Sequence, residues 1–173
     1  LTGSRPDTIG VIENRAYFRD LNPQIVTLPQ HFITHGYTAV YSGKIFHGRM
    51  TDEQHSWNHK PNRKGLTRPT TPGGNALPGN QRIYARNKAR MVALYGESSS
   101  RGLIHGPAFE AAPVEDDGYV DGYNTRVAIQ TLDELVQQDK PWFLALGFVR
   151  PHLPFHAPKK YFDLYDPEEI QLT

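Results

Sequence analysis

An amphipathic helix pattern followed by a nearly unbroken apolar run constrains the fold more than any other feature of this sequence. Apolar residues recur at intervals of three and four from Ala128 to Val136, which predicts a helix with one buried face. Asn124 or Thr125 can cap the start of this helix. The next run, residues 142–149, is apolar apart from one glycine, which is typical of a strand buried on both faces.

A second helix-then-strand unit lies nearer the start of the chain. Thr27 and Pro29 mark a helix start and Gly36 marks its end. The β-branched and aromatic run over residues 37–41 then predicts a strand that ends near Gly43. Two such units indicate an α/β fold, with a mostly parallel sheet covered by helices.

The segment between the two units is rich in residues that form turns. Residues 48–120 hold most of the glycine, proline, asparagine and serine of the chain, taken together, which predicts a long loop-rich insertion. One helix is expected within it, over residues 83–95, with Gly96 as its end. A stretch of this length without regular structure is usually either functional or disordered, and here we expect a substrate-specificity insertion.

Composition excludes several classes of function. Lys and Arg number 19 against 18 Asp and Glu, and a net charge of +1 gives no field to attract nucleic acid or an anionic membrane. We therefore expect neither as a partner. The chain has no cysteine, which excludes disulfides, thiolate zinc sites and cysteine nucleophiles but leaves the cellular compartment open. Any chemistry must rest on His, Lys, Arg or carboxylates.

Two segments each place a cation and a histidine just after a predicted strand. Lys44 and His47 follow the first strand, and Arg150 and His152 follow the second. Ligands of open α/β sheets bind at the carboxyl ends of the strands, so we expect these four residues to form one pocket. Two cations and two histidines suit a sulfate, phosphate or carboxylate group.

Structural roles remain open for the same four residues. Lys44 and His47 could belong to a solvated loop, His152 could pack between its flanking prolines, and Arg150 could be a surface cation.

Other groups are weaker candidates. His47, His55 and His59 could be metal ligands, but Pro61 and its neighbours argue against the helix that would align two of them, so we expect no metal site. Four cations over residues 60–68 predict a solvated loop, with contact to an anionic polymer as the alternative. The acidic pair Asp116 and Asp117 beside Gly118 predicts a turn, with cation binding as the alternative.

Four stretches of the chain match, in order, the motifs of one protein family. They are residues 1–8, residues 27–47 with Gly-Lys-x-x-His, residues 124–135 with 142–148, and residues 150–165 with Arg-Pro-His-x-Pro-Phe. Their order and spacing resemble the type I, formylglycine-dependent sulfatases, most closely the iduronate-2-sulfatase-like branch. The resemblance covers more than half of the chain, and residues 48–120 match no motif of the family.

The resemblance implies an alkaline-phosphatase-like fold, a calcium ion, and a formylglycine made from a signature Cys or Ser. The implied activity is hydrolysis of sulfate esters on a sulfated sugar or glycosaminoglycan, in a periplasmic, secreted or lysosomal protein. Lys44 resembles the lysine that binds sulfate oxygens, and His47 the histidine that assists release of sulfate. His152 resembles the histidine that contacts the ester and assists departure of the sugar. Arg150 is expected to bind substrate.

The family pattern also extends beyond both ends of the sequence. The signature and the paired metal-binding aspartates would precede Leu1, and the later metal ligands and second lysine would follow Thr173. Residues 1–173 are therefore expected to be an internal portion of a single sulfatase catalytic domain. The remaining part of that sulfatase would be a partner, and the isolated chain would be inactive. The alternatives are a related phosphate or phosphonate ester hydrolase and a noncatalytic glycan-binding fragment.

Overall fold

The structure, a computed structural model, describes residues 1–14, 16–47 and 50–171. These residues fall into two compact units. The first comprises Leu1–Gly65 and Asn124–Phe148, and the second comprises Leu66–Tyr123 and Val149–Thr173.

Helices and short parallel strands make up both units. Among the described residues, no helix combines the length and the apolar character that crossing a membrane requires. In chain order the elements are α1 (Pro6–Ile9), α2 (Phe18–Leu21), α3 (Leu28–Thr34), β1 (Thr38–Gly43), α4 (Glu53–Ser56), η1 (Pro72–Gly74), α5 (Pro78–Ser100), β2 (Phe109–Ala112), η2 (Asp116–Gly118), α6 (Val120–Leu135), β3 (Trp142–Gly147), β4 (Phe155–Pro158), α7 (Lys159–Phe162) and η3 (Pro167–Glu169).

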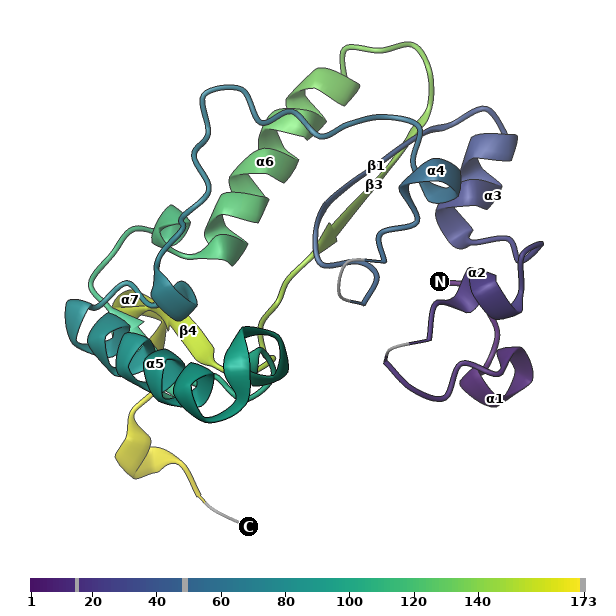
Figure 1. The fold of residues 1–173 in the computed structure, drawn as a ribbon. Helices are drawn as coiled ribbons and strands as arrows, with labels where there is room; N and C mark the ends of the chain where they lie inside the picture. The colour runs from purple at the N-terminus through teal and green to yellow at the C-terminus, as the bar shows by residue number, and fades with distance from the viewer. Residues whose placement is uncertain (15, 48–49, 172–173) are drawn as a thin grey trace. The chain divides into compact units, whose positions relative to one another are not determined.

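The first unit is built on the parallel pair β1 and β3 (Figure 1). The two strands pair from Thr38 opposite Trp142 to Gly43 opposite Gly147. Helix α3 packs against β1 and against α4. The parallel pairing of two strands that are distant in sequence confirms the predicted α/β class.

Helix α3 begins and ends where the sequence predicts. Thr27 Oγ1 accepts a hydrogen bond from the Gln30 backbone N–H at 3.3 Å, and Gln30 Oε1 accepts one from the Thr27 N–H at 3.4 Å. This reciprocal capping box satisfies two backbone donors at the start of the helix. Gly36 lies just past the end with φ +86°, a conformation that favours glycine.

Strand β3 is less buried than predicted. Trp142 keeps 37% and Leu146 39% of its surface exposed. The two side chains lie on the same face of the strand, because side chains alternate along it. On the opposite face, Phe143 stacks on Phe32 of α3 with ring centroids 4.6 Å apart. The prediction of burial on both faces is therefore wrong for the described chain, because no residue of β3 is fully buried and the face of Trp142 and Leu146 is the more exposed one.

Helix α6 begins before the predicted caps, so Asn124 and Thr125 lie inside it. Its buried face also differs, because Ile129 and Val136, both part of the predicted apolar face, are more than half exposed. Thr131 lies inside instead, at 0% exposure. The observed face is rotated toward Thr131 relative to the apolar pattern.

The segment between the two predicted units carries more regular structure than its composition predicts. The helix expected over residues 83–95 exists as part of α5, which starts earlier, at Pro78. Gly96 has φ +78° and ψ 163°, so it interrupts the helical backbone at the predicted end. Strand β2 follows, where no strand is predicted. Residues 48 and 49, at the start of the segment, lie outside the described residues.

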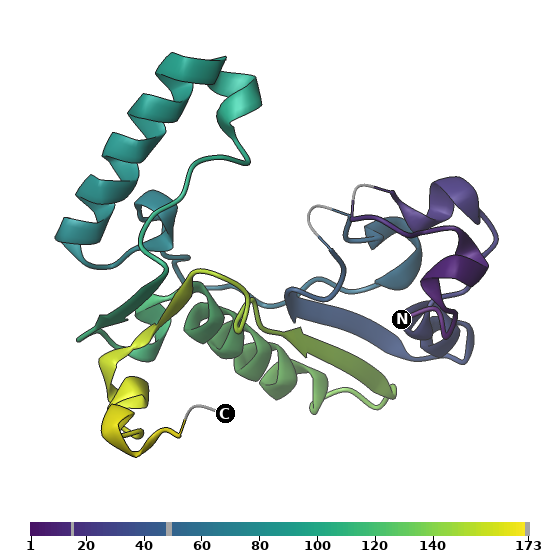
Figure 2. The same ribbon diagram turned by 90° about the horizontal axis from the view of Figure 1, so that it is seen from below.

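The second unit is built on the parallel pair β2 and β4 (Figure 2). Glu110 of β2 lies opposite His156 of β4 in the register. Strand β4 is not predicted, because residues 155–158 directly follow a turn that ends at Pro154, and the strand itself ends at Pro158. The short helix α7 follows β4, as the family resemblance implies.

Candidate active site

The backbone of Lys44 is fixed to the carboxyl end of the β1 and β3 pair. The Lys44 N–H donates to the Gly147 carbonyl at 2.8 Å. A Cβ on Gly43 would lie 2.0 Å from the Gly147 oxygen, and a Cβ on Gly147 would lie 1.9 Å from the Lys44 oxygen. The backbone after β1 and the backbone at the end of β3 approach this closely only because Gly43 and Gly147 are both glycine. Lys44 therefore follows β1 directly, as predicted, and is half-buried.

Replacing Gly43 by alanine is expected to lower the free energy of unfolding by about 1–3 kcal/mol, because Cβ would clash with backbone and φ is +79°. Urea unfolding measures the loss. Gly65→Ala is the matched control, because Gly65 has φ +74° but no atom within 4 Å of the added carbon. Equal losses for the two variants would contradict the close approach at Gly43.

His47 lies on the same segment, three residues beyond Lys44, and its side chain is exposed. It borders a cavity of about 300 Å³ together with Tyr17, Phe18 and Phe46. The Phe46 ring stacks on Phe18 of α2 with centroids 5.6 Å apart. Helix α2 therefore supports the chain immediately before His47.

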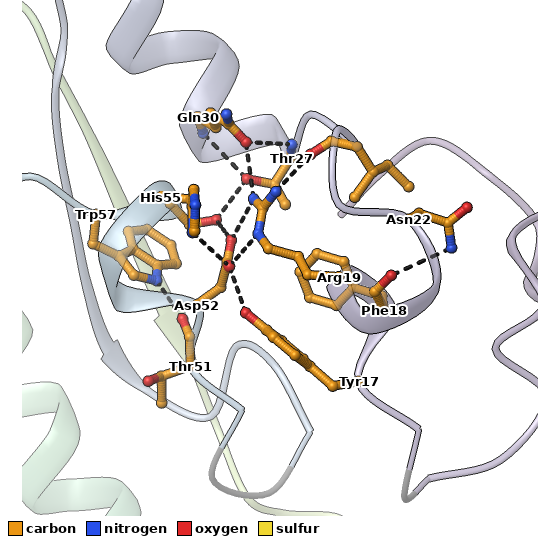
Figure 3. Close-up of polar contacts among 12 residues, drawn as sticks. Tyr17, Phe18, Arg19, Asn22, Thr27, Gln30, Thr51, Asp52, His55 and Trp57 are labelled. Carbon is orange, nitrogen blue, oxygen red and sulfur yellow. Dashed lines mark hydrogen bonds and ion pairs between the residues drawn. The ribbon is translucent and has the colours of Figure 1, made fainter.

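Further along the chain from His47, a buried ion pair joins Asp52 to Arg19 of α2 (Figure 3). Arg19 Nε donates to Asp52 Oδ1 at 2.5 Å, and Arg19 Nη2 donates to Asp52 Oδ2 at 2.8 Å. Arg19 is 8% exposed and Asp52 is 5% exposed. This two-point contact joins α2 to the residue that precedes α4.

Further hydrogen bonds surround the pair. Asp52 accepts from the Tyr17 hydroxyl at 2.7 Å and from the Ser56 hydroxyl. Arg19 Nη2 also donates to Gln30 Oε1 at 2.9 Å, which connects the pair to α3. Almost every polar atom of the pair thus has a partner, which is the condition under which buried charges are tolerated.

The same contacts fix the charge state of Asp52. Burial alone would raise the pKa of Asp52, but hydrogen bonds from Arg19, Ser56 and Tyr17 lower it below its ordinary value. Burial and the hydrogen bond to Asp52 raise the pKa of Tyr17 to about 12. Asp52 is therefore ionised and Tyr17 is neutral at physiological pH.

Arg150 and His152 share one turn of the second unit. The Asp121 carboxylate accepts from the backbone N–H groups of Val149 at 2.8 Å and Arg150 at 2.9 Å. Arg150 Nη1 donates to the His152 carbonyl at 2.5 Å. The His152 side chain is exposed, and its Nδ1 lies 2.6 Å from the Leu153 carbonyl oxygen. Asp121, which sequence reasoning missed, holds the start of this turn.

The structure thus places the four predicted residues as two pairs. Lys44 and His47 lie on one segment of the first unit, and Arg150 and His152 lie on one turn of the second. That both pairs form a single pocket stays a prediction.

Two of the three histidines considered as metal ligands have carboxylate neighbours. His55 Nδ1 lies 3.6 Å from Asp52 Oδ1, and His59 Nε2 lies 3.3 Å from Glu134 Oε1. Asp116, considered as a cation ligand, pairs with Lys160 at 2.8 Å. In the part of the chain that the structure describes, no three His, Asp or Glu side chains are grouped to hold a metal ion.

The second unit contains a buried carboxylate and a buried histidine that sequence reasoning also missed. Glu110 is 1% exposed and accepts from the Tyr119 hydroxyl at 2.7 Å and from the Ala76 N–H at 2.6 Å. His156, opposite Glu110 in the register, is 3% exposed. Its Nε2 has no hydrogen-bond partner among the described residues.

His156 is expected to make stability depend on pH. Burial lowers the pKa of His156, and the positive charge of Arg150 lowers it further. Glu110 and the Gly74 backbone raise this pKa, but by less. The unfolded chain, with a histidine pKa of about 6.5, then binds more protons than the folded chain. Stability is therefore full above about pH 6.5 and is lost as pH falls through the folded pKa.

The measurement is urea unfolding at several pH values between about 5 and 7. His156→Gln should reduce the dependence on pH, whereas His105→Gln, which changes an exposed histidine of the same unit, should retain it. An unchanged dependence in His156→Gln would contradict the prediction.

Comparison with known proteins agrees with the motifs at these positions. The sulfatase family model matches residues 1–170. The chain is 28% identical over 181 residues to an iduronate 2-sulfatase of Mus musculus, covering 100% of the chain and 29% of that relative. It is 30% identical over 180 residues to a sulfatase of Formosa agariphila, covering 99% of the chain and 32% of that relative.

A shorter match has higher identity. An arylsulfatase of Clostridium perfringens is 46% identical over 46 residues, which is 25% of the chain and 10% of that relative. The chain spans about a third of the length of the mouse and Formosa relatives, at 29% and 32%. Because the family model covers nearly every residue, the chain belongs to the sulfatase family.

Proposed function

We propose that the protein containing this chain hydrolyses sulfate esters of a sulfated sugar or glycosaminoglycan-type substrate. The observation that carries the proposal is the match of the sulfatase family model to residues 1–170. The chain would form an internal portion of a single catalytic domain. Residues 48–120, which include α5 and β2, would be its specificity insertion.

Lys44 and Arg150 are the cations of the proposed site. Lys44 would bind the sulfate oxygens, and the fixed backbone at Gly147 supports this role because a preorganised cation stabilises developing charge without reorganising. Arg150 would bind substrate through its planar guanidinium group.

His152 would give a proton to the sugar oxygen as the bond between that oxygen and sulfur breaks. Its Nδ1 lies beside a carbonyl oxygen, which can only accept, so Nδ1 keeps its hydrogen and Nε2 remains to exchange a proton with the substrate. His47 would assist the later release of sulfate.

The family resemblance implies calcium and formylglycine for the full-length protein. The chain has no cysteine, and the signature motif is not within it. The described residues contain no cluster of ligands suited to a metal ion. We therefore assign the nucleophile and the calcium site to the remaining part of the protein, and we expect the isolated 173-residue chain to be inactive.

Turnover by the full-length protein tests the proposal. 4-Nitrophenyl sulfate and a sulfated glycosaminoglycan disaccharide should release sulfate, and 4-nitrophenyl phosphate should react much more slowly. Faster release of phosphate would favour a phosphate ester hydrolase instead. Glycan binding without any turnover would indicate a noncatalytic protein.

A further inference from the structure

A second cavity of the first unit lies apart from the segment of Lys44 and His47. Its volume is about 660 Å³, and the residues that line it include Tyr41, Trp57, Lys60, Pro61, Arg63 and Glu134. It is large enough for a sugar unit, and its lining combines aromatic rings with charged groups, as ligand sites commonly do.

Two cations at this cavity lack a partner. Lys60 and Arg63 are exposed, and neither forms an ion pair with any described residue. Glu53 accepts a hydrogen bond from the Tyr41 hydroxyl at 2.8 Å, and Glu134 lies 3.3 Å from His59. Lys60 and Arg63 are therefore the charged groups of the cavity that have no such neighbour among the described residues.

Aromatic rings form one wall. Tyr41 and Trp57 lie with ring centroids 4.8 Å apart. Trp57 is only 8% exposed, and its Nε1 donates to the Thr51 carbonyl at 2.8 Å, so its ring is held in place. Arg63 lies close enough to Tyr41 to oppose the rise in the Tyr41 pKa that burial and Glu53 cause. A cation thus stands beside the aromatic wall.

The loop that carries both cations is held at both ends. Asn58 Oδ1 accepts from the Ala39 N–H of β1 at 2.7 Å. Further along the loop, the Asn62 N–H donates to Thr131 Oγ1 at 2.8 Å, and Gln130 Nε2 donates to Asn62 Oδ1 at 2.8 Å. Because β1 and α6 hold this backbone, little conformational entropy remains to be lost when a ligand binds.

We propose that this cavity binds an acidic sugar unit of the glycan substrate. This unit would be a different one, further along the glycan, from the unit that loses sulfate. The aromatic wall faces the apolar side of a sugar ring, and Lys60 and Arg63 bind its sulfate or carboxylate group. The inference rests on the proposed function for the nature of the glycan. It adds a site that favours long acidic substrates over short ones.

Two probes test the inference on the full-length protein. Binding of a fluorescent heparin-derived hexasaccharide is measured by anisotropy, and turnover of 4-nitrophenyl sulfate reports the catalytic site separately. The double variant Lys60→Gln with Arg63→Gln should bind the hexasaccharide about tenfold more weakly or worse, because charge-assisted contacts are lost. Its turnover of the small ester should not change.

A matched pair controls for net charge. Lys140→Gln with Lys159→Gln removes the same charge at two exposed positions outside the cavity and outside residues 48–120, and should leave hexasaccharide binding within about twofold. Equal weakening by both pairs, or undiminished binding by the cavity variant, would overturn the inference. Absence of 4-nitrophenyl sulfate turnover in the unsubstituted protein would instead refute the proposed function. The comparison of hexasaccharide binding would still show whether the cavity binds the acidic sugar.

Discussion

Replacing Asp52 by asparagine is expected to lower the free energy of unfolding by about 3–5 kcal/mol, as measured by urea or thermal unfolding. The change leaves the Arg19 guanidinium buried without its counter-charge, and an uncompensated buried charge is among the most destabilising defects in a protein. Asparagine suits the test because Asp52 has φ +54°, a conformation that asparagine tolerates. The loss therefore reports charge and not backbone strain.

An exposed ion pair supplies the control for this substitution. Asp163 pairs with Lys159 one helical turn away, and both side chains are 55% exposed. Asp163→Asn should therefore cost no more than about 0.5 kcal/mol. A loss for Asp52→Asn as small as that of the control would show that the buried pair contributes little.

Acid should weaken the same pair. The folded pKa of Asp52 is lowered, so its contribution to stability is present above the ordinary aspartate pKa of about 3.9 and is lost as pH falls through the folded value. Asp52→Asn should remove this part of the acid sensitivity. Because Asp52 ends the segment that begins at Lys44, a weakened pair should also loosen the chain around His47.

Short-range signals in the sequence predict the parts of the fold that depend on neighbouring residues. Thr27 and Gln30 form their capping box within one turn, and Gly36 ends the same helix two residues past Thr34. The position of Lys44 after β1 follows from the same local pattern. These predictions are confirmed because the interactions involved span only a few residues.

Burial of single side chains is not predicted as well, because it depends on what packs against each element. Thr131 is buried although it is polar, since its hydroxyl donates to the Val127 carbonyl at 2.6 Å and accepts from the Asn62 N–H at 2.8 Å. Ile129, on the expected apolar face, is 56% exposed. The apolar period alone cannot show a distant donor such as Asn62.

The buried charges escape prediction for the same reason. Arg19 and Asp52 are 33 residues apart, and each has the sequence signature of a surface residue. Glu110 becomes an interior residue only through donors such as Tyr119 and the Ala76 backbone. For the candidate site, the sequence predicts residues that would touch substrate, which stays a prediction, but it gives no sign of residues that hold them, such as Asp121.

In the full-length protein, His152→Ala is expected to reduce turnover of an unactivated sugar sulfate by about 10²–10⁴-fold, with a smaller change in KM. A proton given to the departing sugar oxygen matters mainly in the transition state, so its loss appears in kcat. Steady-state kinetics of sulfate release measure both constants.

Lys44→Ala should behave differently. A cation on the sulfate oxygens stabilises both the bound substrate and the transition state, so its loss should raise KM as well as lower kcat. The two variants therefore distinguish a proton donor, His152, from a cation that binds the sulfate group, Lys44. Thermal unfolding should first show that both variants are as stable as the unsubstituted protein.

The leaving group provides the decisive comparison between these two variants. An activated aryl sulfate releases a phenolate that needs little protonation, so it should partly restore turnover in His152→Ala. It should leave Lys44→Ala impaired, because the sulfate group that Lys44 would bind is the same in both esters. Equal losses for both variants on activated and unactivated esters would show that His152 binds substrate or supports the turn at Arg150, and the proton-donor role would have to be abandoned.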